Sequence, residues 1–559
     1  MFMRSNGIRK ILLLIIFNLT VVGIFSEPLN ITDPNNSIYR IYEQWRDARL
    51  VKSLPHVMPY PLQIHRALLS EVLANSKTPA SERAIAREYL EYVSPEQKPG
   101  ISYAGTKLLI QPYYSDKLYG EAGAGVDAGG YLSENTTLAL NFLAFGKDEN
   151  HPNPQIDTFE DNADITIKGR TIDLRQSFSS VFAIGDTGLY FQSGISRVSM
   201  APTFDTNGVL SGQASHLPEF SLLWNTKNFS ISNTYLELTA SNYIGENEFS
   251  GKHMFVQTMS WRPPIIDGLE LYLYQTSVWG GRFDMLYFVP FSYLMYSQSF
   301  NGFSDNSLLG GALEYRFGPA ISYRSDALVD DADLNRLVRL DFGGKNKMVW
   351  ENELTWTPLH PWLRSLALSY TMVTPYMYTH RGDRFEEYDP LDVTTYFDDV
   401  LSSEPNYQNY THFGDSIGAQ LKPNSDLLLL RYRSRPLAGL LILMRGSFSR
   451  HGNATDDLVG DFLNNPSAYT EEGGLFDDGY NDEPYAAFNN GVGFLTQNIL
   501  EYTIKVDASL GYIFEIGSHE LAATLGAFYT HEENSGFIKG KTTNNVETMI
   551  SILYRHRFR

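Results

Sequence analysis

Apolar and polar residues alternate along most of this chain, in segments with the two-residue period that is typical of β-strands. The alternation begins near Ile101 and continues to the C-terminus. In the clearest segment, the apolar face consists of Ile504, Val506, Ala508, Leu510, Tyr512 and Phe514, and the opposite face consists of Thr503, Lys505, Asp507, Ser509 and Gly511. An apolar face backed by a face with Lys and Asp fits a strand with lipid on one side and water on the other.

The length of these segments distinguishes a transmembrane barrel from a soluble β-sandwich, because strands of both folds show this alternation. Strands of a soluble sandwich are shorter, whereas a tilted strand needs about 9 to 11 residues to cross a bilayer. The segments here reach or exceed that length. We therefore expect an all-β fold in which residues 101–559 form one transmembrane antiparallel β-barrel.

A different pattern precedes the barrel. Apolar side chains at helical spacing predict three short helices, over residues 37–50, 61–74 and 78–93. The third is expected to begin with Thr78 as its N-cap and Pro79 at its first position. Three short helices bury little apolar surface alone, so residues 27–100 are expected to dock on the barrel as a periplasmic α-helical region. A small soluble helical domain is the alternative.

The first 26 residues have the features of a secretory signal. These features are the cationic residues Arg4, Arg9 and Lys10, an apolar run over residues 11–25, and the small residue Ser26 at a plausible cleavage point. The run is short for a membrane span, so a cleaved signal peptide is favoured over a membrane anchor. An exported protein without helical spans is periplasmic, secreted or an outer-membrane barrel.

The expected connections between strands are of two kinds. Short turns are predicted at 114–116 and 424–425, and long acidic loops at 151–162, 379–408 and 453–490. Short turns on one side and long polar loops on the other are typical of bacterial outer-membrane barrels.

The final strand carries a further signal. Its apolar and aromatic face consists of Ile550, Ile552, Tyr554, His556 and Phe558. A terminal aromatic strand resembles the segment that the barrel-assembly machinery recognises, although Arg559 follows Phe558 here. We therefore expect that machinery and outer-membrane lipid among the partners.

The amino-acid composition excludes several kinds of site and partner. The chain has 559 residues, a formal net charge of -20, no Cys, 35 Tyr and 33 Phe. Without Cys there are no disulfides, thiolate metal sites or lipid-anchor cysteine. The acidic balance argues against a nucleic-acid partner, and abundant aromatics fit the interface girdles of a barrel. No GxSxG, HExxH or phosphate-binding glycine loop occurs, so we expect no enzyme and no cofactor.

An acidic stretch at residues 477–483 (DDGYNDE) raises the possibility of a Ca²⁺ site, because closely spaced oxygen ligands around a glycine turn bind this ion. Its spacing does not match an EF-hand loop, and a solvated acidic loop is the favoured interpretation. No metal site is therefore predicted.

The row Arg431, Arg433 and Arg435 is the main candidate site. If the intervening Tyr432 faces lipid, all three arginines point into the lumen, where they could hold carboxylates or phosphates bidentately. The row is therefore a set of possible contacts for an anionic ligand. Pairing with inward acids such as Asp341 and Asp507 is the simpler alternative.

The middle of the chain resembles the capsule-assembly (Wzi-type) outer-membrane protein family. The segments that carry this resemblance are 194–202 (GISRVSMAP), 253–264 (HMFVQTMSWRPP), 269–281 (LELYLYQTSVWGG), 287–290 and 301–309 (NGFSDNSLL). Within them Arg197, Pro202, Asp305 and Asn306 are motif positions of unknown role. The resemblance implies a closed barrel of about eighteen strands in the bacterial outer membrane. It also implies occlusion by helices and loops, and a role with capsular or exopolysaccharide.

The sequence departs from the family pattern at two places. A glycine-rich element expected after Arg197 is reduced to residues 200–202, and Gln275 stands where an acid is expected. Three functions therefore compete. The first is association with surface polysaccharide, the second is a porin-like or hydrophobic-solute transport channel, and the third, an outer-membrane hydrolase, lacks motifs.

Overall fold

The computed structural model describes residues 30–95, 99–148, 163–167, 170–201, 206–239, 251–289, 293–294, 296, 299–301, 305–331, 338–339, 346–375, 377–378, 409–412, 415–437, 439–452 and 493–558. The expected signal peptide, Pro202, the three acidic loops and the 477–483 stretch lie outside these residues. The predictions made for them stay predictions.

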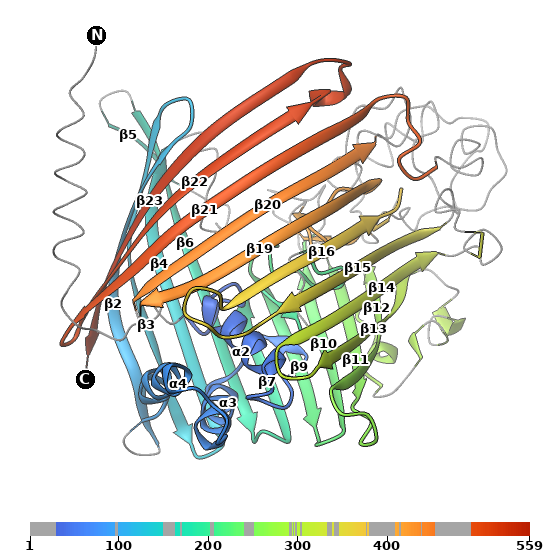
Figure 1. Cartoon of the computed structure of the whole chain (residues 1–559). Coiled ribbons are helices and arrows are strands. Elements are labelled where there is room, and N and C mark those ends of the chain that lie inside the picture. Colours follow the sequence, from blue (N-terminus) through green and yellow to red (C-terminus); the bar gives the residue numbers. More distant parts are fainter. Residues whose placement is uncertain are drawn as a thin grey trace, which may run out of the picture.

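Eighteen antiparallel strands form a closed barrel (Figure 1). They are β2 (Gly100–Tyr114), β3 (Leu118–Ser133), β4 (Thr136–Asp148), β6 (Arg170–Gly185), β7 (Leu189–Ser196), β9 (Leu217–Asn225), β10 (Phe229–Leu238), β11 (Lys252–Trp261), β12 (Leu269–Gly280), β13 (Asn306–Phe317), β14 (Ile321–Asp331), β15 (Lys347–Trp356), β16 (Ser365–Val373), β19 (Ser425–Leu437), β20 (Leu440–Gly452), β21 (Leu500–Ile516), β22 (His519–Glu533) and β23 (Thr542–Phe558). The first and last strands close the ring, with Ala104 opposite Phe558. A short additional strand, β5 (Ala163–Ile167), pairs with β6.

The two faces of the wall follow the predicted alternation. On β21, Val506 and Leu510 are 46% and 45% exposed on the outer face. On β19, Leu428 and Leu430 face outward, whereas Arg431, the next residue, lies on the inner face and is buried inside the barrel. The all-β barrel prediction and its register on these strands are confirmed.

The strand connections are short at one end of the barrel, the short-turn end, and mostly long at the other, the long-loop end. Gly517, with a φ of 63°, allows the tight turn between β21 and β22 at the short-turn end. The expected turn at 114–116 is real but lies at the long-loop end, between β2 and β3. The turn expected at 424–425 is wrong, because Asn424 ends the long connection from β16 to β19 and Ser425 begins β19.

Aromatic side chains mark the short-turn end of the outer face. Trp224, Trp261, Phe317 and Trp356 stand at or next to the last residue of their strands, and all are exposed. Amphipathic aromatic rings at this level are typical of a membrane interface.

The helical region is present as predicted, with small shifts of its boundaries. It contains α2 (Ser37–Asp47), α3 (Leu62–Ala74) and α4 (Ala80–Val93). The third helix begins one residue later than expected, with Pro79 as its N-cap. Thr78 instead donates its hydroxyl to the carbonyl of Val72, which ties α4 to α3. No helix among the described residues is long and apolar enough to span a membrane.

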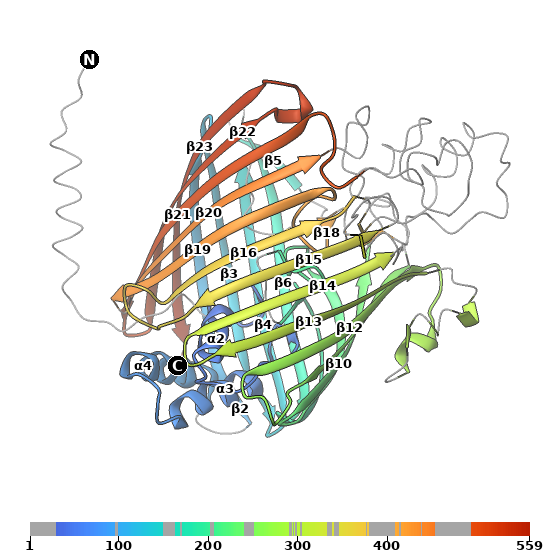
Figure 2. The same cartoon turned by 45° about the vertical axis from the view of Figure 1, so that its right-hand side comes forward.

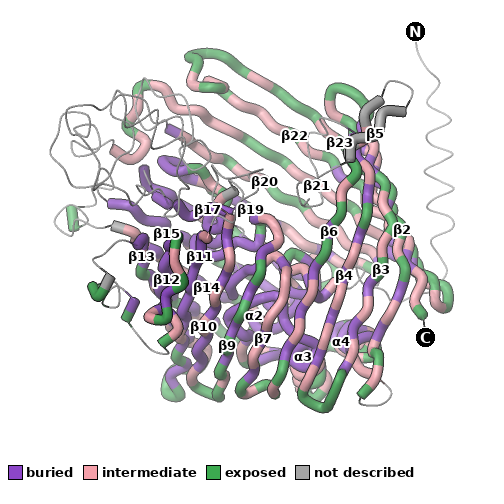
Figure 3. The backbone as a smooth tube through the Cα atoms, turned by 180° about the vertical axis from the view of Figure 1, so that it is seen from behind, coloured by how far each residue is buried: buried purple, intermediate pink, exposed green. Residues whose placement is uncertain are grey.

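The helices divide the lumen into a filled and a hollow side. Figures 1 and 2 show α2 inside the barrel and α3 and α4 at the short-turn end. Two inward segments, residues 197–201 with 206–216 and residues 409–412 with 415–424, join α2 in one buried core that includes Trp45, Met200 and Tyr410. Figure 3 shows buried residues concentrated on β10 to β15 and on the helices, whereas β20 to β23 carry mostly half-buried or exposed residues.

Short strand pairs hold these inward segments. β1 (Val57–Met58) pairs with β8 (Ser199–Met200), and β17 (Thr411–His412) pairs with β18 (Asp415–Ser416). The first pair links the helical region directly to the segment that follows β7. One side of the lumen is therefore filled by α2 and these two inward segments.

Candidate functional site

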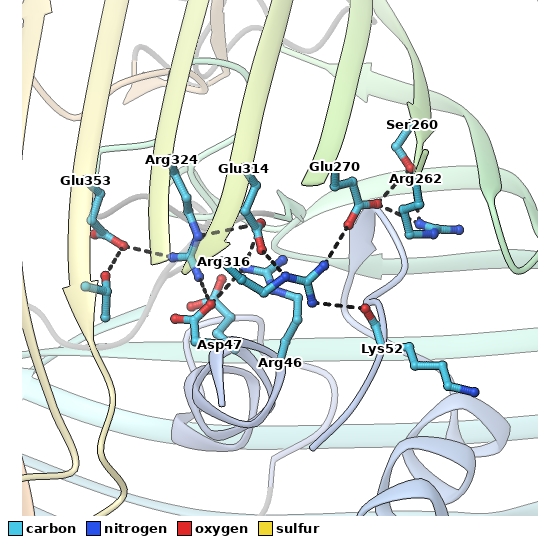
Figure 4. A network of polar contacts seen from close by, with 12 residues as sticks. Arg46, Asp47, Lys52, Ser260, Arg262, Glu270, Glu314, Arg316, Arg324 and Glu353 are labelled. Atoms are coloured by element: carbon cyan, nitrogen blue, oxygen red, sulfur yellow. Dashed lines mark hydrogen bonds and ion pairs between the residues drawn. The ribbon is translucent and has the colours of Figure 1, made fainter. Parts of the chain in front are cut away.

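A buried network of ion pairs attaches α2 to the barrel wall (Figure 4). Arg46 lies 3.1 Å from a carboxylate oxygen of Glu314 on β13. Arg324 on β14 donates to Asp47 at 2.6 Å and to Glu353 on β15 at 2.8 Å. All five side chains are buried. Because removing one partner of a buried ion pair is strongly destabilising, this network fixes the position of α2 in the lumen.

The same network takes in the first arginine of the predicted row. Arg431 donates to Glu353 at 3.0 Å and is buried. The simpler alternative, pairing with an inward acid, therefore holds for Arg431, and the acid is Glu353. Of the two expected acids, Asp341 lies outside the described residues and Asp507 pairs with Arg445 at 2.8 Å.

A second polar cluster joins α2, α4 and the wall. Arg364, just before β16, donates from both Nη atoms to Glu82 of α4 at 2.8 Å, and its Nε donates to Gln44 of α2 at 3.1 Å. Trp45 Nε1 donates to the same carboxylate at 2.7 Å. Burial alone would raise the pKa of Glu82, but the Arg364 guanidinium, the hydrogen bond from Trp45 and the charge of Arg435 together outweigh it and hold that pKa below its usual range.

This cluster makes docking of the helices sensitive to acid. A carboxyl with a lowered folded-state pKa stabilises the fold above its unfolded pKa of about 4.3, and the contribution is lost as pH falls through the folded value. The helical circular-dichroism signal should therefore melt at a nearly constant temperature from pH 7 to 5 and earlier below about pH 4. In Glu82→Gln the stability at pH 7 should drop and the acid-dependent part should shrink. An unchanged pH profile in this variant would contradict the role of Glu82.

A cavity of about 470 Å³ lies between α2 and the inner face of β19 to β23. Its charged lining consists of Arg40 on α2, Arg364, Arg433 and Arg435 on β19, and Arg445 on β20. No Asp or Glu is among the described residues that line it. The predicted row is thus divided, because Arg431 belongs to the buried network and Arg433 and Arg435 belong to the cavity.

The motif positions from the family resemblance lie apart from this cavity. Arg197 follows β7 at the point where the chain enters the lumen. Asp305 is buried, pairs with Arg282 at 2.5 Å and accepts a hydrogen bond from Tyr287. Asn306 is buried as the first residue of β13. Asp305 therefore anchors the 281–289 segment of a long-loop connection, which is a structural role.

Gln275, which stands where an acid was expected, belongs to a ladder of amides on the outer face of the wall. Asn233, Gln257 and Gln275 stand opposite one another on β10, β11 and β12. The side-chain bonds between successive members are both 2.7 Å, and Gln275 also accepts from the backbone N–H of Leu294 at 2.9 Å. Neutral amides suit this place, because each can donate to one neighbour and accept from the next.

Two of the cavity arginines, Arg40 and Arg364, could not be singled out from the sequence. Arg40 lies on α2 and Arg364 in a turn, so neither shares a strand with the predicted row. Only the position of α2 inside the barrel brings them together. No cluster of three or more potential metal ligands occurs among the described residues.

The closed ring of strands with an apolar outer face defines the protein as a bacterial outer-membrane β-barrel. No protein-family model matches the chain, and no curated protein sequence matches it. Among solved structures, the chain is similar to Wzi of Escherichia coli, described as an outer-membrane protein involved in group 1 capsule assembly and as a carbohydrate-binding β-barrel. That match has a TM-score of 0.52 and 11% identity, and it covers 93% of this chain and 98% of Wzi.

Two further structures are OccAB2 of Acinetobacter baumannii and OprD of Pseudomonas aeruginosa. Their TM-scores are 0.40 and 0.38, each is 12% identical, and each match covers 83% of this chain, with 100% and 98% of the other chain respectively. At these identities the likeness is one of fold.

Proposed function

We propose that this barrel associates with capsular or exopolysaccharide at the cell surface, without enzymatic activity. The observation that carries the proposal is the filled side of the lumen, where α2 is held by buried ion pairs and two inward segments complete a core. A wide diffusion pore needs an open lumen. Here α2, held in the lumen by buried ion pairs, obstructs such a pore. The carbohydrate-binding description of Wzi, with which the chain shares its fold, supports the same function.

The proposal includes an orientation. Short turns of outer-membrane barrels face the periplasm, so the helical region is periplasmic and the long connections face the cell surface. Removal of residues 1–26 as a signal peptide and recognition of the final strand by the barrel-assembly machinery belong to the same proposal. Polar loops with many aromatics suit sugars, because an aromatic ring offers an apolar face beside polar partners.

A porin-like channel is the second candidate, and one observation favours it. The inner faces of β20 and β21 carry the half-exposed or exposed residues Arg445, Lys505 and Asp507. Water therefore reaches this wall, and a narrow path along it would conduct small solutes.

Two measurements separate these functions. A strain lacking the gene should lose surface polysaccharide to the medium in a capsule stain, and the purified full-length protein should give little conductance in a planar bilayer. Steady open channels in the bilayer together with normal capsule retention in the deletion strain would reject polysaccharide association in favour of transport.

A further inference from the structure

We propose that the arginine-lined cavity beside α2 binds a carboxylated sugar unit, such as a uronate. The proposal rests on the proposed function and deepens it, because it names the charge class of the glycan. The cavity volume of about 470 Å³ falls within the roughly 300–1,000 Å³ typical of small-ligand pockets.

The charge of the lining selects the anion. Five arginines line this space, and the described lining residues contribute no carboxylate. Two of the five already have an acidic partner outside the lining, because Arg364 donates to Glu82 and Arg40 donates to Glu43 at 3.0 Å. Arg445 pairs with Asp507 at 2.8 Å, yet its side chain is 44% exposed and within reach of a ligand. A guanidinium carries five donors in a planar fork that matches a carboxylate, so one ion pair does not exhaust it.

The remaining lining fits a sugar ring better than a bare inorganic anion. Amide and hydroxyl groups that can meet sugar hydroxyls come from Gln44, Gln213, Ser509, Thr524 and Ser551. Apolar surface for the C–H face of a pyranose comes from Leu441, Leu443 and Ile513. A site with guanidinium, amide, hydroxyl and aliphatic groups around one space is complementary to a sugar acid.

The place of the cavity limits the ligand to a short unit. Arg433 and Arg435 lie near the short-turn end of β19, and Arg445 lies in the first half of β20 after the turn. The cavity is thus inside the barrel, away from the long-loop end. It takes an acidic unit that enters the lumen, not a polymer lying across the loops.

The chain supplies a matched control on a single strand. Arg445 and Arg450 both lie on β20, their side chains are 44% and 40% exposed, and each pairs with an aspartate. They stand five positions apart and so point to opposite faces of the strand. Arg445 lines the cavity, whereas Arg450 pairs with Asp426 on the outer face. Arg450→Gln therefore removes a similar charge without touching the cavity.

The test is calorimetry of the full-length protein in lipid nanodiscs with galacturonate, its neutral counterpart galactose, and inorganic phosphate. We expect galacturonate to bind at least about tenfold more tightly than the other two, and more weakly as salt is raised. Arg445→Gln should weaken galacturonate binding about tenfold, the order expected for one charge-assisted hydrogen bond. Arg433→Gln should weaken it further, and Arg450→Gln should leave it unchanged.

Other outcomes overturn the inference in distinct ways. Equal binding of galactose rejects selection by charge, and equal binding of phosphate rejects a sugar-acid site. The same loss in Arg450→Gln and Arg445→Gln, or no galacturonate binding at all, rejects the cavity as the site. If Arg433→Gln fails to fold, Arg445→Gln decides alone. A failed binding test leaves capsule loss in the deletion strain intact, so the two proposals fail separately.

Discussion

Replacing Glu314 by Gln should release α2 from its place in the lumen, so that the barrel conducts ions. The carboxylate of Glu314 lies 3.1 Å from Arg46 and 3.6 Å from both Arg316 and Arg324, and it is fully buried. The variant keeps the side-chain shape but leaves these guanidinium groups without that counter-charge. Breaking a buried pair in this way costs about 3–5 kcal/mol. Planar-bilayer conductance should rise, and trypsin should cut the helical region faster.

Asp507→Asn is the control for this experiment. It breaks the pair with Arg445, but that pair is partly exposed, and exposed pairs contribute less than about 1 kcal/mol. Conductance and protease resistance should stay close to those of the parent protein, and both variants should keep the heat-modifiable migration of a folded barrel. If Glu314→Gln stays closed and resistant, apolar packing around Trp45 holds α2 and the ion network does not.

The fold could be predicted from the sequence because the helical spacing and the strand alternation of apolar residues are both local properties of the chain. A strand between lipid and water must alternate, so the faces of β21 and the direction of Arg431, Arg433 and Arg435 followed from the order of residues. Helix boundaries followed within a few residues from spacing and proline. The turn at 424–425 could not be predicted, because polar dipeptides occur in turns and at the ends of long loops alike.

The candidate site was predictable only in part, because partners in a barrel come from distant segments. Nothing near Arg431 in the sequence points to Glu353, which is 78 positions away and lies on β15, with β16 between that strand and β19. Arg40 reaches the cavity only because α2 enters the lumen. Which inward charges form a buried network and which line a cavity depends on how α2 and the inward segments fill the barrel, and alternation carries no signal for that.

The second large effect is a loss of folding free energy expected for a substitution at Leu510, on the outer face of β21. This side chain is 45% exposed on the face that meets lipid, near the middle of a strand that runs from Leu500 to Ile516. Leu510→Arg places a charge among acyl chains, which costs about 2–4 kcal/mol near the bilayer midplane. The variant should refold into lipid vesicles with a correspondingly lower free energy of folding, measured by urea titration.

Ser509→Arg is the matched change, because it introduces the same side chain at nearly the same depth on the opposite face. Ser509 lines the cavity beside Arg445, so the new charge meets water and a like charge that the water screens. We expect a loss of less than about 1 kcal/mol, the scale of interactions between exposed charges. Equal losses in the two variants would mean that Leu510 does not face lipid. A larger loss in Ser509→Arg would mean that the cavity is drier than the exposure of Arg445 indicates.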